Sequence, residues 1–412
     1  MSACGNGRSF SALWRVLGAA AGLMALGGCD LGGDSYVKKS ETILRQSLRS
    51  DRATVRMLAM TAYRELERDI PAEELEVLLG DPFAPSRFLA VMCKAEQASQ
   101  RGKQRRRDLS YFRVLYNKET DPSVRLAAVY GMALLGDMSH VERLAEALGA
   151  RGGDAAARRN AAMLLGLLGN KTAAPMLGAY LSDADAAVQM NAAEAMGRLG
   201  STRGLDLLRQ VATSQGSPRQ IGAILALGRV GLVPRDVVLL REGFSDEKPV
   251  SAMARLASYG ARAMLGDYTQ AARLGEMAAG RPGRDPIDVQ DKAMILQLLA
   301  RSAYGPSWRS VVPSLDDGDP LIRASAAWAI LAFDSAEGKK LRDTIDASTA
   351  TERGVQHLTE GEILRPGTSP ESKPSGASPG RKPSGTSPLL REPRAGPLGP
   401  IEPIRPQDTR VR

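Results

Sequence analysis

The sequence predicts an all-α fold, an α-solenoid of about nine helical-hairpin repeats over residues 40–348. One phrase is written three times, at residues 121–136, 154–169 and 185–200. The phrase opens with Asp, continues with paired alanines and ends at Gly. Its successive starts are 33 and 31 residues apart, and a degraded copy begins 32 residues later at Ser217. A fixed period of this size indicates a solenoid, because no single unit buries its apolar face alone.

Residues 1–28 form a separate segment. Arg8 and Arg15 precede an apolar run at 16–28, which is shorter than the roughly 20 residues that a spanning helix needs but suits the h-region of a signal peptide. The run ends in Leu-Gly-Gly-Cys at Cys29, which resembles the bacterial lipobox. That resemblance implies cleavage before Cys29, lipidation of Cys29 and a tether at 29–39. The alternative is an ordinary signal peptide with a chance cysteine.

The signal peptide and the lipid on Cys29 together predict a location in the cell envelope, with the chain lipid-anchored to a membrane and facing the periplasm or the exterior. Cysteine usage agrees with it, because Cys4 leaves with the signal and Cys29 carries the lipid. Cys93 then remains alone and lies in an apolar run, so we expect a buried small side chain rather than a reactive thiol.

Each period contains two helices, for example 171–181 and 185–199. The Asp precedes the second helix, where a short carboxylate accepts hydrogen bonds from unpaired backbone N–H groups. A following Pro, as in Asp121-Pro122, suits the first helical position. The closing Gly, as at Gly136 and Gly200, suits a helix end that needs positive φ. In each clear unit the Asp, the apolar pattern and the Gly therefore predict the same bounds for the second helix.

The pattern Asp-x-x-Val-Arg-x-x-Ala-Ala-x-x-Leu-Gly resembles HEAT repeats, and more narrowly the short HEAT-like repeats of phycobilisome lyases. The resemblance covers about residues 40–345 and implies an arc whose inner surface, lined by the second helices, is the default binding surface. It also implies a structural ladder in which Arg pairs with the Asp of an adjacent repeat. The alternative is a positive stripe for an anionic partner. The residues of the predicted caps and ladder are Asp121, Arg125, Asp154, Arg158, Asp185, Asp319 and Arg323.

Catalytic constellations are missing from the sequence. HEAT-like di-iron hydroxylases carry His-Glu pairs, because iron needs imidazole and carboxylate ligands together. This chain has two histidines, His140 and His357, and neither is followed by Glu. Two histidines also leave no zinc site of several His or Cys and almost no general base of that type. We therefore expect no cofactor, no metal and no enzymatic activity.

Two surface features are candidates for contacts. The run Arg101, Lys103, Arg105, Arg106 and Arg107 would touch anionic lipid head groups, or else form a solvated loop between repeats. Trp308, which follows Gly-Pro-Ser in a predicted loop, is the candidate surface anchor. Nucleic acid is an unfavoured partner, because aromatic residues make up only 4% of the chain.

The C-terminal part differs in composition. Eleven of the chain's 24 prolines fall within residues 366–412, which predicts a disordered tail after a cap or transition at 349–365. Anchor, repeats and tail together predict a membrane-anchored, non-catalytic scaffold that binds one or more partner proteins. The alternatives are a lyase-type enzyme or enzyme subunit, and an electrostatic tether to anionic lipid or wall polymer.

Overall fold

The computed structural model describes residues 33–101, 104–150, 154–245, 247–280 and 288–335. These residues belong to one compact unit, residues 1–354. Within them the chain is helical and contains no strand, so the predicted all-α solenoid is confirmed. The predicted signal peptide, Cys29, the segment 349–365 and the tail at 366–412 lie outside the described residues. None of the described helices has the length and hydropathy needed to cross a bilayer.

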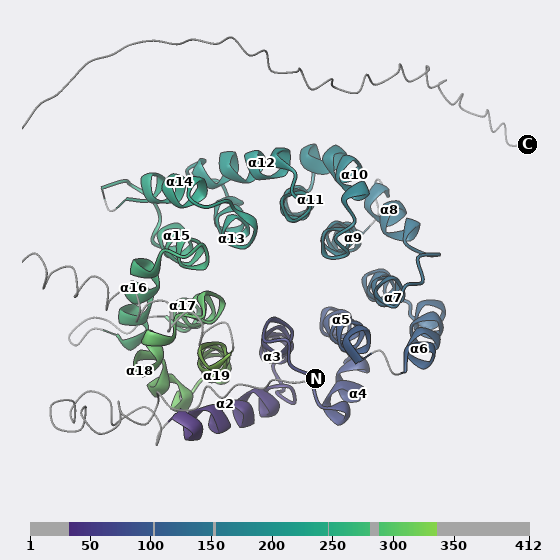
Figure 1. The fold of residues 1–412 in the computed structure, drawn as a ribbon, viewed down its shortest axis with the longest axis horizontal. Coiled ribbons are helices and arrows are strands. Elements are labelled where there is room, and N and C mark those ends of the chain that lie inside the picture. Colours follow the sequence, from purple (N-terminus) through teal and green to yellow (C-terminus); the bar gives the residue numbers. More distant parts are fainter. Residues whose placement is uncertain (1–32, 102–103, 151–153, 246, 281–287, 336–412) are drawn as a thin grey trace, which may run out of the picture. The chain divides into compact units, whose positions relative to one another are not determined.

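The described helices form nine consecutive pairs, each with an outer and an inner member (Figure 1). The inner helices are α3 (Ala53–Glu65), α5 (Ala84–Arg101), α7 (Pro122–Leu134), α9 (Ala155–Leu167), α11 (Ala186–Arg198), α13 (Gln220–Val230), α15 (Ala252–Met264), α17 (Val289–Ser302) and α19 (Pro320–Asp334). The outer helices are α2 (Gly33–Ser47), α4 (Ala72–Leu79), α6 (Arg105–Lys118), α8 (Glu142–Gly149), α10 (Ala174–Gly178), α12 (Thr202–Thr213), α14 (Arg235–Gly243), α16 (Tyr268–Ala279) and α18 (Trp308–Val311). Short 3₁₀ turns flank α10 and α18.

The inner helices pack against one another with small residues at the contacts. The alanine pairs of the repeated phrase, such as Ala161-Ala162 and Ala192-Ala193, are fully buried. At Gly166 on α9, a Cβ atom would come within 2.6 Å of the Ala195 Cβ on α11. The two helices could not lie this close with a larger residue at Gly166, so the small residues set the spacing of neighbouring repeats.

The described array closes on itself, which corrects the open arc that the sequence analysis expects. Helices α2 and α3 pack against α19 (Figure 1), and side chains of the first two repeats share one buried apolar cluster with those of the last three. Ion pairs join Lys39 to Asp316 at 2.6 Å and Arg52 to Asp319 at 3.0 Å across the junction. The first and last repeats thus cover each other's apolar faces, and we call the closed array of α2–α19 the ring.

Candidate functional site

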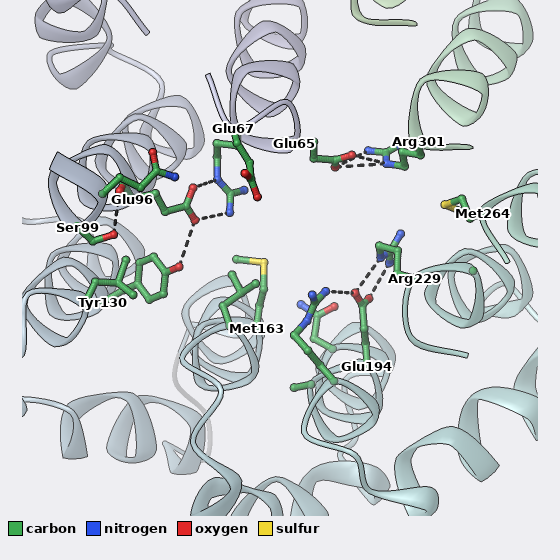
Figure 2. A pocket seen from close by; sticks show the side chains of 18 residues that line it. Glu65, Glu67, Glu96, Ser99, Tyr130, Met163, Glu194, Arg229, Met264 and Arg301 are labelled. Atoms are coloured by element: carbon green, nitrogen blue, oxygen red, sulfur yellow. Dashed lines mark hydrogen bonds and ion pairs between the residues drawn. The ribbon is translucent and has the colours of Figure 1, made fainter. Parts of the chain in front are cut away.

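The inner helices surround a cavity of about 890 Å³ (Figure 2). Its lining comes from α3, α5, α7, α9, α11, α13, α15 and α17, or from the residues that directly follow them. The lining is mixed in charge, with four basic and four acidic side chains. They are Arg64, Arg198, Arg229, Arg301, Glu65, Glu67, Glu96 and Glu194.

One charged cluster in the cavity joins α3, α5 and α7. The Arg64 Nε and Nη2 atoms donate to the two Glu96 carboxylate oxygens at 2.8 and 2.7 Å, and the Tyr130 hydroxyl donates to Glu96 Oε1 at 3.1 Å. Burial lowers the pKa of Arg64, but the hydrogen bonds and charge of Glu96 outweigh burial, and the pKa lies above its usual value. Burial and then the charge of Glu96 raise the pKa of Tyr130. Arg64 and Tyr130 therefore stay protonated at neutral pH.

A second cluster joins α11 and α13. The Arg229 Nε and Nη2 atoms donate to the two oxygens of Glu194 at 2.8 and 2.6 Å, and Arg198 Nη2 donates to Glu194 Oε1 at 3.1 Å. Burial alone would raise the pKa of Glu194. The hydrogen bonds and charge of Arg229, followed by the charge of Arg198, outweigh burial and hold that pKa below its usual value. Glu194 is therefore a permanent carboxylate near pH 7.

A third pair crosses the closure of the ring. Arg301 on α17 approaches Glu65 at the end of α3, with 3.2 Å between Arg301 Nε and Glu65 Oε2. The Arg301 guanidinium also lies 4.7 Å from the ring centroid of Trp328 on α19, within the range of a cation–π contact. Arg301 thus joins the first repeat, the eighth and the ninth at the cavity wall.

Apolar side chains lie between these clusters. Leu134, Met163 and Leu167 line the cavity from α7 and α9, and Met264 lines it from α15. Figure 2 shows Met163 between the Tyr130 cluster and the Glu194 cluster. Methionine adapts its shape to different apolar groups, so this wall can receive an apolar side chain between two polar regions.

Sequence reasoning missed the charged residues of the cavity, because they differ from repeat to repeat while the repeated phrase is shared. One signal was available for Glu67. A degraded copy of the repeated phrase begins at Asp51 with Asp-Arg-Ala-Thr-Val-Arg. In that copy Glu67 stands one residue beyond the position that Gly136 and Gly200 hold in theirs. A charged residue next to the expected stop of a helix was a visible departure from the pattern.

The four predicted capping residues lie at the N-termini of inner helices. Asp121 accepts a hydrogen bond from the Val124 N–H at 3.0 Å. The corresponding bonds are Asp154 with the Ala156 N–H at 2.9 Å, Asp185 with the Ala187 and Val188 N–H groups at 2.9 and 3.0 Å, and Asp319 with the Leu321 N–H at 2.7 Å. Each carboxylate satisfies backbone donors that have no partner within the helix.

The ladder differs from the predicted one, because its acid lies two residues before the cap. Asp183, for example, accepts from the Asp185 N–H and also binds Arg158 of the preceding repeat at 2.8 Å. One oxygen of Asp183 accepts from the Asp185 N–H and the other accepts from Arg158, so this acid joins the two repeats. The ladder pairs among the described residues are Arg56 with Asp81, Arg87 with Glu119, Arg158 with Asp183 and Lys292 with Asp317.

Two predicted ladder residues have other contacts. Arg125 lies over the ring of Tyr116, 5.1 Å from its centroid. The ladder acid for Arg125 would stand two residues before Asp154, but the sequence has Gly152 there, which offers no carboxylate. Arg323, in the last described repeat, donates to the backbone oxygens of Asp317 and Gly318 at 2.6 and 2.9 Å.

Comparison with known proteins identifies the repeats. Residues 149–228 match the family model for HEAT repeats, and this match spans α9–α12 and most of α13. The protein contains HEAT repeats. No curated protein matches the chain.

Two solved structures resemble the HEAT-repeat array. One is the complex of CpcE and CpcF of phycocyanin lyase from a Nostoc species, with 21% identity, 65% of this chain and 93% of that chain covered, and a TM-score of 0.36. The other is human deoxyhypusine hydroxylase in complex with glycerol, with 17% identity and a TM-score of 0.29. The match covers 74% of this chain and 99% of that chain.

The predicted basic run spans the end of α5 and the start of α6, in the second and third repeats: Arg101 ends α5, and Arg105 begins α6. Arg101 pairs with Asp69 at 2.6 Å, and Arg105 donates to the Leu135 backbone oxygen at 2.7 Å. Arg106 and Arg107 are exposed, and Lys103 lies outside the described residues. Arg101 also borders a second hollow of about 480 Å³ between α4, α5 and α6. Structural contacts thus take up two of the predicted cations and leave Arg106 and Arg107 facing solvent.

Trp308 begins α18 of the ninth HEAT repeat and is half-buried. Its ring lies 6.2 Å from that of Tyr36 on α2, centroid to centroid, and 5.4 Å from the Arg309 guanidinium. Trp308 therefore contributes to the closure of the ring and keeps one part of its surface exposed.

Cys93 is buried on α5, and burial raises the pKa of its thiol well above its usual value. His140 packs edge-on against Tyr116 on the outer side of the repeats, and His357 lies outside the described residues. Within the part of the chain that the structure describes, no group of three or more His, Cys, Asp or Glu side chains is placed to hold a metal ion.

Proposed function

We propose that this HEAT-repeat protein is a membrane-anchored, non-catalytic interaction module of the cell envelope that binds a segment of a partner protein in its central cavity. The observation that carries the proposal is the cavity itself, about 890 Å³ in volume and lined by the inner helices of eight repeats. Function in repeat proteins resides in such surfaces, where the residues that differ between units come together.

The composition of the lining supports a protein as the partner. Four arginines and four glutamates balance in charge, and the leucines and methionines add apolar surface. A site for nucleic acid would carry a basic excess, and a site for a polycation an acidic one. A polypeptide segment offers both signs of charge together with apolar side chains, which is the combination that this wall complements.

The ionisation of the lining supports a non-catalytic role. A general acid or base works best with a pKa near the operating pH. The pKa of Glu194 is held below its usual value, and the pKa values of Tyr130 and Arg229 are raised. Burial and then the charge of Glu96 move the pKa of Tyr130 away from neutrality, whereas ion pairs do so for Glu194 and Arg229 and also hold those two side chains in place.

The position of Cys29 supports the anchor. Gly33, where α2 begins, lies four positions after Cys29, and a fully extended chain spans at most about 14 Å over four positions. A lipid on Cys29 would hold α2, and with it the closure of the ring, close to the membrane surface. We expect Cys29→Ala to move the protein from the membrane fraction to the soluble fraction. Retention of the variant in membranes would contradict the anchor.

The binding role is tested by site-specific photo-crosslinking in native membranes. A crosslinker at Ser99 or Asn191 faces the cavity, whereas one at Gln210 on outer helix α12 is exposed on another surface. We expect one protein of defined mass to be crosslinked from both cavity positions and not from Gln210. Equal crosslinking from all three positions would contradict a partner in the cavity. Turnover of a substrate by the purified protein, lost on Glu194→Gln, would contradict the non-catalytic role.

A further inference from the structure

Glu67 ends the inner helix α3 in a backbone conformation that glycine occupies in other repeats. Its φ is 51°, in the left-handed region. The Glu67 N–H donates to the Arg64 carbonyl at 3.0 Å, and the Arg68 N–H donates to the Tyr63 carbonyl at 2.9 Å. The same two bonds close α7, α11 and α15, where the left-handed residues are Gly136, Gly200 and Gly266 with φ of 81°, 84° and 92°.

A glutamate at this position is unfavourable for the fold. A side chain in the left-handed region crowds the following carbonyl oxygen, which glycine avoids. Ala303, at the end of α17, is the other non-glycine residue with positive φ in the described part of the chain. Ala303 is buried and does not line the cavity. Strain of this kind persists where a residue has another role, and Glu67 has a place where such a role is possible.

The Glu67 side chain lines the cavity and is exposed to it (Figure 2). The basic side chains nearest to it along the chain are already paired, Arg64 with Glu96 and Arg68 with Glu41. Across the closure, Arg301 pairs with Glu65. Among the described residues, the Glu67 carboxylate makes no ion pair or hydrogen bond, in contrast to the other three glutamates of the cavity.

We propose that the Glu67 carboxylate binds a cationic group of the partner segment, an amine or a guanidinium, while Leu134, Met163 and Leu167 receive an apolar side chain next to it in the partner sequence. The proposal rests on the proposed function of the cavity and adds the chemistry of its ligand. Every other charged side chain of the wall has an opposing partner among the described residues, with Arg198 and Arg229 sharing Glu194, so the Glu67 carboxylate is the group left to bind a cation.

The strain supplies the test. Glu67→Gly relieves the left-handed conformation and removes the carboxylate, so we expect a variant that is more stable and binds less well. Its melting temperature should rise by about 1–3 °C. Glu67→Gln keeps the strain and removes the charge. Ala303→Gly is the matched control, since it relieves the same strain away from the cavity.

The binding probe is a fluorescein-labelled hexapeptide of alternating lysine and leucine, measured by anisotropy, with alternating glutamate and leucine as the counterpart. We expect the lysine peptide to bind the wild type more tightly than the glutamate peptide. Glu67→Gly and Glu67→Gln should each weaken its binding about tenfold, and Ala303→Gly should leave binding unchanged. Equal binding by the wild type and both Glu67 variants would overturn the assignment, as would a wild type that does not bind the lysine peptide. Either result leaves the cavity crosslinking from Ser99 and Asn191 as the separate test of the proposed function.

Discussion

At the residue scale, the most deeply buried ion pair of the described residues lies outside the cavity, between outer helices α12 and α14. Arg209 Nε and Nη2 donate to the two oxygens of Asp236 at 2.6 and 3.0 Å, and the side chains are 7% and 0% exposed. Asp236 also accepts from the Leu232 N–H at 2.6 Å. Both charges are withdrawn from water, so each depends on the other.

We predict that Asp236→Asn lowers the free energy of unfolding by about 3–5 kcal/mol, because it removes the buried counter-charge of Arg209 and leaves only an exposed one. The control is Asp206→Asn, which removes the exposed partner of the same arginine and should change stability by at most about 1 kcal/mol. Urea denaturation followed by circular dichroism measures both. Similar losses in the two variants would show that burial of the Asp236 carboxylate does not matter.

Asp137, which follows the glycine at the C-terminal end of α7, makes a pH-dependent contribution to the free energy of unfolding. Hydrogen bonds from the Ser139 hydroxyl, from Arg113 and from the Ser139 N–H lower the pKa of Asp137 to about 2. In the unfolded chain this pKa is about 3.9. The unfolded state therefore binds more protons between these values, and stability falls as the pH falls through this window.

We predict that the wild type loses more of its free energy of unfolding between pH 4 and pH 2 than Asp137→Asn does. The two proteins should show parallel pH dependence above about pH 5, where Asp137 is ionised in both states. Denaturation curves at a series of pH values give the comparison. Parallel curves down to pH 2 would contradict the lowered pKa.

At the scale of elements, the ladder ties four of the described inner helices, α3, α5, α9 and α17, each to the loop before the next inner helix. Arg87 pairs with Glu119, and both side chains are mostly buried. We predict that Arg87→Ala lowers the free energy of unfolding by about 2–4 kcal/mol, since Glu119 stays behind without its cation. Arg125→Ala removes only the contact with Tyr116 and should cost at most about 1 kcal/mol. Chemical denaturation measures the free energy of unfolding of both variants. An equal loss of free energy in the two would argue against the ladder.

The helices and their ends could be predicted from the sequence because their causes are local. An N-cap acts over two or three residues, and a left-handed residue that ends a helix acts over five. The roles of Asp121 and Gly136 can therefore be predicted from the nearby sequence alone. The acids of the ladder were harder to find. Glu119 is longer than Asp183 and Asp317, and the residues around the three acids differ, so only the packing of two repeats shows that they hold equivalent positions.

At the scale of the whole described array, closure could not be predicted from the repeat pattern. Closure depends on the sum of small rotations between neighbouring repeats, and the sequence of a single repeat does not specify that rotation. The charged residues of the cavity depend on closure in turn, because Glu65 and Arg301 meet across 236 positions of sequence. The site was therefore predicted only as the inner surface, without its residues.

Closure makes the two ends of the array a single cooperative region. Leu44 on α2 is buried in the cluster that α2 shares with α19. We predict that Leu44→Ala, through its lost packing, speeds amide hydrogen exchange in both α2 and α19. Leu164→Ala on α9 is the control and should speed exchange only in neighbouring repeats. Unchanged exchange of α19 in Leu44→Ala would mean that the ends are independent.

The pairing of the first helix with the last also sets an order in time. The ribosome completes α2 long before it reaches Pro320, where α19 begins, and at about 5–20 residues per second the delay is about 15–60 seconds. The repeats between them can stack as they appear, since each needs only its neighbour. Helix α2 packs against α3 of its own repeat, but the part of its apolar face that α19 covers stays exposed until the ninth repeat exists.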